Sequence, residues 1–196
     1  MLPPPKLQNI GEEFQKSMAQ SLKDHPQLQK QLNQAYDLGQ KDQQEELENV
    51  LHFAHDIGFY APALTIASSW PGETYVYHFN EGNPWEGKWK GRSTHILDIA
   101  FLLQNYNDHL SAEQRASAVK FGEHVIDFVC GKKPYPAYKE NEGGAIVYGL
   151  GQAGKTEFVR STKAEDYGRR GTIFELAKEA DLDTLKSVWD GFLRGR

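Results

Sequence analysis

The sequence is short of cysteine, with Cys130 as the only one in 196 residues. A single cysteine excludes an intramolecular disulfide, so the fold does not depend on an oxidising compartment. Cys130 ends the apolar run "VIDFVC". A cysteine in such a run is typical of a small core residue rather than of a reactive thiol.

Long hydrophobic runs are also absent. No segment approaches the roughly 20 apolar residues that a membrane-spanning helix needs. The first ten residues, "MLPPPKLQNI", contain neither the basic segment nor the apolar segment of a secretory signal peptide. We therefore expect a cytoplasmic protein without a membrane partner.

An excess of positive charge is missing as well. The 22 Lys and Arg residues are outnumbered by 27 Asp and Glu residues, and the net charge is −5. The basic residues are scattered, with "GKWKGR" and "YGRR" as their only small clusters. Because nucleic-acid-binding domains usually carry a basic face, we expect no nucleic-acid partner. The remaining composition, 39% hydrophobic and 25% charged, is that of a globular protein.

The order of apolar patterns predicts a mixed α/β fold with few strands. Helical spacing predicts two or three helices near the N-terminus, the last running from about Gln43 to Ala67, where Pro62 should kink or break it. The aromatic and β-branched stretch Thr74–Asn80 predicts the best strand. Further helices are expected at residues 95–106, 112–130, 171–180 and 182–193.

The helix expected at residues 95–106 has a broad apolar stripe and a polar start. Ser93 or Thr94 is placed to cap it, and Asp98 lies early enough to favour the positive end of the helix dipole. The stripe consists of Ile96, Ile99, Ala100, Leu102, Leu103 and Tyr106. This pattern predicts that the stripe faces the core.

The glycine-rich segment Gly149–Thr156, "GLGQAGKT", fits the P-loop pattern G-x-x-x-x-G-K-[ST]. A P-loop needs a following helix whose N-terminus meets the phosphates. No helix with a packed apolar face is visible after Thr156, and strand-like runs lie on both sides of the glycines. The sequence therefore favours a small hairpin, with nucleotide binding as the less favoured alternative.

Among the seven histidines, His95 has the most suggestive position, between a loop that follows the best strand and an amphipathic helix. His52, His55 and Asp56 could share a helix face as metal ligands, but no further ligand accompanies them, and an exposed helix face explains them better. His124 falls on the polar side of its helix. We expect no metal and no cofactor.

Three stretches resemble the C-terminal part of type-B carboxylesterases, the cholinesterase and lipase branch of the α/β-hydrolase fold. They are "YVYHFN", "HILDIAFL" beginning at His95, and "FGEHVIDFVCGKKPYPAY". The resemblance is strongest from about Asp56 to Tyr138 and favours fungal-type members. The family pattern is His-Gly-x-Glu and later Phe-Gly. This chain has Ile96 and Asp98 in the first part and Leu103-Gln104 in the second.

The resemblance implies that His95 is the general base of a Ser-His-acid triad that hydrolyses carboxylic esters through an acyl-enzyme. The G-x-S-x-G serine and the triad acid are not found in these residues. In this fold the order along the chain is serine, acid, histidine. We therefore expect both to lie upstream of Met1 or in a partner chain, and this chain alone to be inactive.

The resemblance also implies the fold: residues 1–196 form a partial, C-terminal carboxylesterase domain, helix-rich, with a small C-terminal hairpin and with loosely packed helices in residues 1–42. The partners it implies are a small-molecule ester and a chain that supplies the upstream part. Tyr60, Trp85 and Trp89 are candidates for the rim of a substrate gorge or for plain aromatic packing. A non-catalytic remnant used for binding or assembly is the alternative function.

Overall fold

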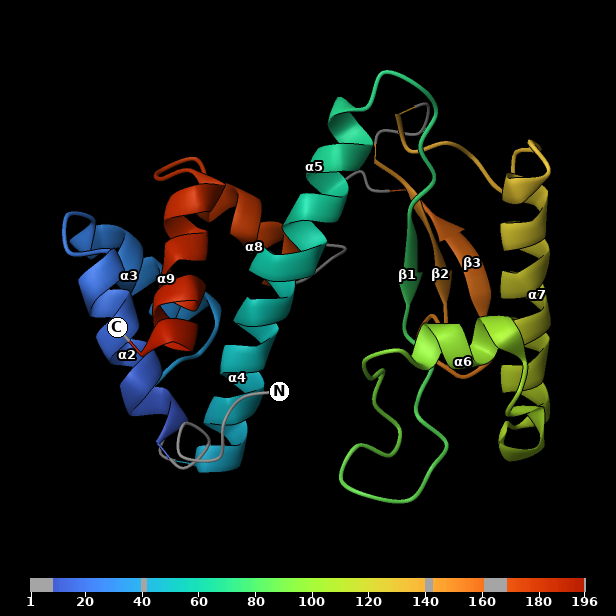
Figure 1. Ribbon diagram of the computed structural model, residues 1–196, viewed down its shortest axis with the longest axis horizontal. Coiled ribbons are helices and arrows are strands. Elements are labelled where there is room, and N and C mark those ends of the chain that lie inside the picture. The colour runs from blue at the N-terminus through green and yellow to red at the C-terminus, as the bar shows by residue number, and fades with distance from the viewer. Residues whose placement is uncertain (1–8, 40–41, 140–142, 161–168, 196) are drawn as a thin grey trace. The chain divides into compact units, whose positions relative to one another are not determined.

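A computed structural model describes residues 9–39, 42–139, 143–160 and 169–195 (Figure 1). Its helices are α2 (Ile10–Ser21), α3 (Pro26–Ala35), α4 (Gln43–His55), the π-helix η1 (Asp56–Tyr60), α5 (Ala61–Ser69), α6 (Leu97–Leu103), the 3₁₀ turn η2 (Asn107–His109), α7 (Ala112–Val129), α8 (Arg169–Leu176) and α9 (Leu182–Arg194). Its strands are β1 (Tyr77–Phe79), β2 (Ala145–Tyr148) and β3 (Thr156–Val159). The expected mixed α/β class, rich in helix and with few strands, is confirmed.

The chain divides into two compact units. The first unit combines residues 1–65 with residues 163–196, and the second unit comprises residues 66–162. Each unit has its own cluster of buried hydrophobic side chains.

The first unit is a helical bundle held by a core of aliphatic and aromatic side chains. Phe14 of α2 is fully buried and meets Phe53 of α4 and Phe192 of α9 edge to face, with ring centroids 5.5 and 5.6 Å apart. Aromatic pairs in this geometry stabilise a core beyond the area they bury. Residues 10–38 contribute much of this core, namely Ile10, Phe14, Met18, Leu22, Leu28, Leu32, Tyr36 and Leu38.

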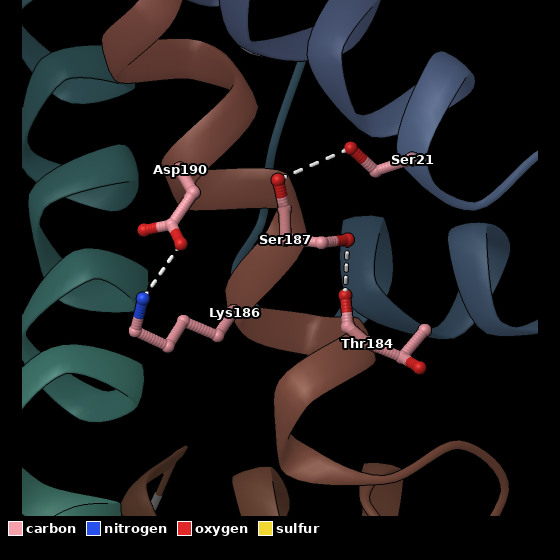
Figure 2. A network of polar contacts seen from close by, with 5 residues as sticks. All are labelled: Ser21, Thr184, Lys186, Ser187 and Asp190. Atoms are coloured by element: carbon pink, nitrogen blue, oxygen red, sulfur yellow. Dashed lines mark hydrogen bonds and ion pairs between the residues drawn. The ribbon is translucent and has the colours of Figure 1, made fainter.

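Serine hydroxyls join α2 to α9 in the first unit. Ser17 donates to the Val188 carbonyl at 2.8 Å, and Ser21 donates to the Ser187 carbonyl at 3.2 Å. Figure 2 shows the second of these bonds beside the bond from the Ser187 hydroxyl to the Thr184 carbonyl. Small residues that also donate hydrogen bonds satisfy polar groups where two helices approach closely.

The helix expected from Gln43 to Ala67 forms, and Pro62 does not break it. α4 continues through η1 into α5, and the Ala61 amide donates to the Asp56 carbonyl, five residues earlier. A proline ring clashes with the carbonyl four residues before it, and a π-turn widens the helix at that point. The wider turn lies directly before Pro62 and lets the chain continue as helix.

The second unit contains a three-stranded sheet in the order β1-β2-β3 (Figure 1). β1 pairs with β2 in parallel, with Tyr77 opposite Ile146 and Phe79 opposite Tyr148. β2 pairs with β3 antiparallel, with Tyr148 opposite Thr156. The helices α6 and α7 lie in the chain between β1 and β2, as a parallel connection requires.

The core of the second unit lies between the sheet and the helices α6 and α7. Phe79 of β1 packs edge to face on Phe101 of α6, and Phe121 of α7 lies 4.8 Å from the Tyr148 ring of β2. α7 starts with a capping box, in which Ser111 accepts from the Gln114 amide and Gln114 accepts from the Ser111 amide. This reciprocal pair satisfies two backbone donors that a helix start leaves open.

Two expectations about α6 are wrong. The side chains of Ile96, Ile99, Leu103 and Tyr106 are exposed, whereas Leu97 and Phe101 form the buried face. Neither Ser93 nor Thr94 caps the helix with its side chain. The helix is only two turns long. Leu97 and Phe101, four residues apart, are the side chains of α6 that are buried in the core beside the sheet, and most of the broader stripe remains exposed to solvent. Asp98 does lie in the first turn.

Two single residues also differ from expectation. Cys130 is exposed, because α7 ends at Val129 and the last apolar residues of the run, among them Phe128, point to solvent. His124 is buried, because it lies on the face of α7 that also carries Phe121. In the described part of the chain, no helix is both long and apolar enough to cross a membrane.

Candidate functional site

The glycine-rich segment is a hairpin connection, as the sequence favoured. Gly149 follows β2 directly, and Thr156 begins β3, which pairs antiparallel with β2. Strand β3, and not a helix, begins directly at Thr156, so the helix N-terminus that a P-loop uses is missing at this place.

Close packing accounts for two of these glycines. Gly149 has a φ of +80°, and a Cβ there would lie 2.7 Å from the Glu81 amide nitrogen. Gly154 has a φ of +77°, and a Cβ there would lie 2.6 Å from the Glu113 carbonyl oxygen. Only glycine combines a positive φ with such a close approach of backbone.

A buried carboxylate lies against the connection. Glu81 is fully buried, and its Oε1 accepts the Gly154 amide at 2.9 Å. Burial raises the pKa of Glu81, although Ser117 and the Gly154 amide favour the charged form. The Glu81 carboxyl group already accepts the Gly154 amide, which a P-loop would donate to a phosphate. An acidic group at this point therefore disfavours phosphate binding.

The strand-to-helix connection that carries His95 is anchored at both ends. Two backbone hydrogen bonds join the start of this loop to its later part. The Asn83 carbonyl accepts the Gly91 amide at 2.8 Å, and the Asn83 amide donates to the Arg92 carbonyl at 3.0 Å. Ser93 then donates to the carbonyl of Phe79, the last residue of β1, at 2.7 Å. His95, two residues later, is therefore held near the carboxyl end of β1.

His95 is exposed and precedes α6 by two residues. No hydrogen bond, ion pair or ring contact joins it to another residue in the described part of the chain. An exposed imidazole on an anchored loop can accept a proton from a group that approaches from outside. No carboxylate of the described residues orients it as the acid of a triad would.

The residue after His95 has an unusual backbone conformation. Ile96 has a φ of +68°, which is uncommon for any non-glycine residue and costly for a β-branched one. Gln104, the residue after α6, has a φ of +56°. In the second unit, these are the only two described non-glycine residues with a positive φ. Strain of this kind is often found beside functional residues.

A hydrogen bond ties the first turn of α6 to the sheet. The Tyr77 hydroxyl of β1 donates to Asp98 Oδ2 at 3.1 Å. Burial raises the pKa of Tyr77 to about 12, and the neighbouring Asp98 carboxylate adds to the effect. The tyrosine thus remains protonated and keeps donating across the physiological range of pH.

Most serines have structural roles. The hydroxyls of Ser17, Ser21, Ser69, Ser93 and Ser187 donate to backbone carbonyls, and Ser111 caps α7. Ser117 is buried beside Glu81. Ser161 lies outside the described residues. None of the described positions among these has the strand-to-helix turn of a G-x-S-x-G serine.

A buried pair on α7 and β2 was not anticipated from the sequence. His124 Nδ1 and the Tyr148 hydroxyl lie 2.6 Å apart. Burial lowers the pKa of His124, with Lys120 adding to the effect, and burial raises the pKa of Tyr148. The sequence signal was the seven-residue spacing from Ser117 to His124, which places both on the buried face of one helix.

The other candidate residues are dispersed. In the described part of the chain, no group of three or more His, Cys, Asp or Glu side chains could hold a metal ion, and this includes His52, His55 and Asp56. Tyr60 is buried in the core of the first unit. Trp85 belongs to the second unit, where it packs on Tyr106 and His109.

Comparisons of the chain with protein-family models, with curated proteins and with solved structures find no match in any of the three.

Proposed function

We propose that this chain supplies the histidine of a carboxylic ester hydrolase and forms the C-terminal part of an α/β-hydrolase fold. His95 is the general base. The nucleophilic serine and the triad acid come from polypeptide outside these residues. The substrate is a small carboxylic ester.

The observation that carries this proposal is the backbone at Ile96 and Gln104. The carboxylesterase pattern has glycine at both positions. Here both residues have a positive φ, +68° and +56°, which is the conformation that glycine adopts most readily. The connection and helix around His95 thus follow a backbone path for which glycine is the favoured residue, although this chain carries other side chains there.

The chemistry follows from what an imidazole does in a triad. His95 would take the proton of the serine hydroxyl as the serine attacks the ester carbonyl, and an acyl-serine would form as the alcohol leaves with that proton. Water, deprotonated by His95, would then attack the acyl-serine carbonyl, and the acid would be released as His95 returns that proton to the serine oxygen. An exposed imidazole on an anchored loop supports this role, because the serine must approach from outside this chain.

The proposal is tested by reconstituting the triad. The chain is co-expressed with a type-B carboxylesterase polypeptide that contains the serine and the acid but ends before the strand preceding its own catalytic histidine. We expect hydrolysis of a short-chain p-nitrophenyl ester, reduced by several orders of magnitude in His95→Ala. His109→Ala, which removes an exposed histidine of the same unit, should retain activity. Equal activity of both variants would contradict the proposal.

The isolated chain gives a second test. A fluorophosphonate probe, which labels activated serines, should not react with the folded chain. Labelling that disappears in His95→Ala would mean that a serine of this chain is the nucleophile. The assignment of the serine to another polypeptide would then be wrong.

A binding or assembly role is the second candidate, and exposed apolar side chains on the second unit favour it. α6 and α7 border a groove of about 440 Å³ lined by Leu102, Leu103, Gln104, Val119, Gly122, Glu123, Val125 and Ile126. Apolar surfaces of this kind mark interaction sites or promote aggregation. A stable monomer in light scattering, at all concentrations tested, would count against this role.

A further inference from the structure

Glu81 is a buried acid that the proposed chemistry does not use. It is fully buried, and its Oε1 accepts the Gly154 amide at 2.9 Å. In the described part of the chain, its Oε2 has no hydrogen-bond partner, and neither has the hydroxyl of the neighbouring Ser117. A buried carboxyl group with an unsatisfied oxygen lowers the stability of a fold. Residues that break the rules of stability in this way are often retained for function.

The stem of the His95 loop consists of residues 81–83 and 91–93, which lie at the two ends of the connection between β1 and α6 (Figure 1). The two ends are in direct contact, because a Cβ at Gly82 would lie 2.9 Å from the Gly91 carbonyl oxygen. The two backbone hydrogen bonds described above also join them. His95 follows the second end by two residues, so a displacement of the stem would displace His95.

Side chains attach the stem to the rest of the second unit. Glu81 accepts the amide of Gly154, which belongs to the connection between β2 and β3. Gln114 Nε2, in the first turn of α7, donates to the Gly82 carbonyl at 2.7 Å. The hydroxyl of Ser93 fixes the second end of the stem to β1. Glu81 thus supplies the attachment of the first end to the hairpin.

We propose that Glu81 is a positioning residue for the reaction at His95. By accepting the Gly154 amide, it fixes the stem to the hairpin and sets the place from which the imidazole reaches the serine. Because Glu81 is fully buried, it acts through His95 and not by contact with the substrate. Its acceptor oxygen serves this role, and its negative charge is not required. This inference rests on the proposed function.

The test uses the co-expressed pair described above and two variants of Glu81. Glu81→Gln keeps an acceptor oxygen for the Gly154 amide, whereas Glu81→Met has a side chain of similar length without that acceptor. We expect the glutamine variant to retain kcat and the methionine variant to lose at least about tenfold, because a misplacement of about 1 Å can lower a rate about a hundredfold. KM should change by less than about twofold, because the base acts in the transition state.

Phe158→Ala is the control for a general loosening of the second unit. Phe158 packs against the same hydrophobic core but lies on β3, outside the stem. This variant should retain kcat under conditions in which circular dichroism shows a folded chain. Equal kcat in the two Glu81 variants would overturn the proposal. A loss confined to KM, or an equal loss of kcat in Phe158→Ala, would also overturn it.

Nuclear magnetic resonance of the chain alone gives a readout that does not depend on activity. Relaxation of the His95 backbone amide reports its order, and exchange of the Gly91 amide, which donates to Asn83, reports closure of the stem. In Glu81→Met, His95 should be more mobile and Gly91 should exchange faster than in Glu81→Gln. The Phe121 amide, inside α7, should behave alike in both variants. Equal order of His95 in the two variants would overturn the proposal.

The outcomes separate this inference from the proposed function. A pair that hydrolyses no ester, although the methionine variant loosens His95 and the glutamine variant does not, supports Glu81 as the anchor of the loop and contradicts the esterase role. Hydrolysis that depends on His95 and is equal in the two Glu81 variants supports the esterase role and overturns the role of Glu81.

Discussion

At the scale of single residues, the backbone of Ile96 should respond most clearly to substitution. A left-handed conformation costs a β-branched residue roughly 1–3 kcal/mol, and glycine relieves this at an entropic cost of roughly 0.5–1 kcal/mol. Because Ile96 is more than half exposed (57%), little burial is lost. We expect Ile96→Gly to raise the free energy of unfolding by about 1 kcal/mol, measured by urea denaturation.

The matched control is Ile99→Gly, an isoleucine three residues later that is also exposed but lies inside α6. Glycine inside a helix is unfavourable, so this variant should lose about 0.5 kcal/mol or more. Destabilisation by both substitutions would show that the Ile96 backbone is not strained.

Glu81 provides a prediction on pH dependence. Burial raises the pKa of Glu81, so the folded chain holds this proton more tightly than the unfolded chain, in which the pKa is about 4.3. Stability should therefore be highest below that value and decrease as the pH rises through the folded-state pKa.

Glu81→Gln should flatten this decrease, because the amide oxygen still accepts the Gly154 amide and does not titrate. The measurement is urea denaturation at several pH values between about 4 and 7.5, which spans the range above the unfolded pKa. Glu123→Gln, an exposed residue with the same charge change, is the control. Parallel pH curves for the wild type and Glu81→Gln would contradict the prediction.

At the scale of elements, α7 and β2 are joined by the His124–Tyr148 contact. Burial is the main cause that lowers the pKa of His124, and the positive charge of Lys120 adds to it. The carboxylates of Glu123 and Asp127 oppose the shift. The unfolded chain therefore binds this proton more readily than the folded chain. Stability should be complete above the unfolded pKa of about 6.5 and decrease as the pH falls through it.

His124→Gln should remove this loss at acid pH, because glutamine can still accept from the Tyr148 hydroxyl without titrating. Thermal unfolding at pH values between about 5 and 7.5 gives the comparison around the histidine pKa. His109→Gln, an exposed histidine of the same unit, is the control. An equally steep loss in His124→Gln would show that other groups cause it.

The elements also show where sequence patterns are sufficient. The hairpin of β2 and β3 was predicted, because glycines between two apolar runs act locally. The buried face of α6 was not predicted correctly. A two-turn helix presents several apolar residues, and the sequence pattern does not show which of them the sheet covers. His124 was placed on the polar side of α7, because the pattern within that helix does not show that Tyr148 of β2 lies against this polar residue.

At the scale of the whole molecule, the exposed apolar residues of α6 and α7 predict association at high concentration. Ile126→Lys places a charge in the groove between these helices and should reduce light scattering. Ile66→Lys is the control, since Ile66 is equally exposed, at 62% against 63%. If both substitutions reduce scattering equally, general charge repulsion rather than the groove controls association.

The sequence by itself determined the absence of a disulfide, the mixed α/β class, the helix that begins at Gln43 and the hairpin at Gly149–Thr156. Each of these depends on composition or on neighbours within a few residues. The tertiary structure decided the burial of Glu81 and His124, the exposure of Cys130 and the anchoring of the His95 loop to Phe79. These depend on contacts between residues that are distant in the chain, which local patterns do not encode.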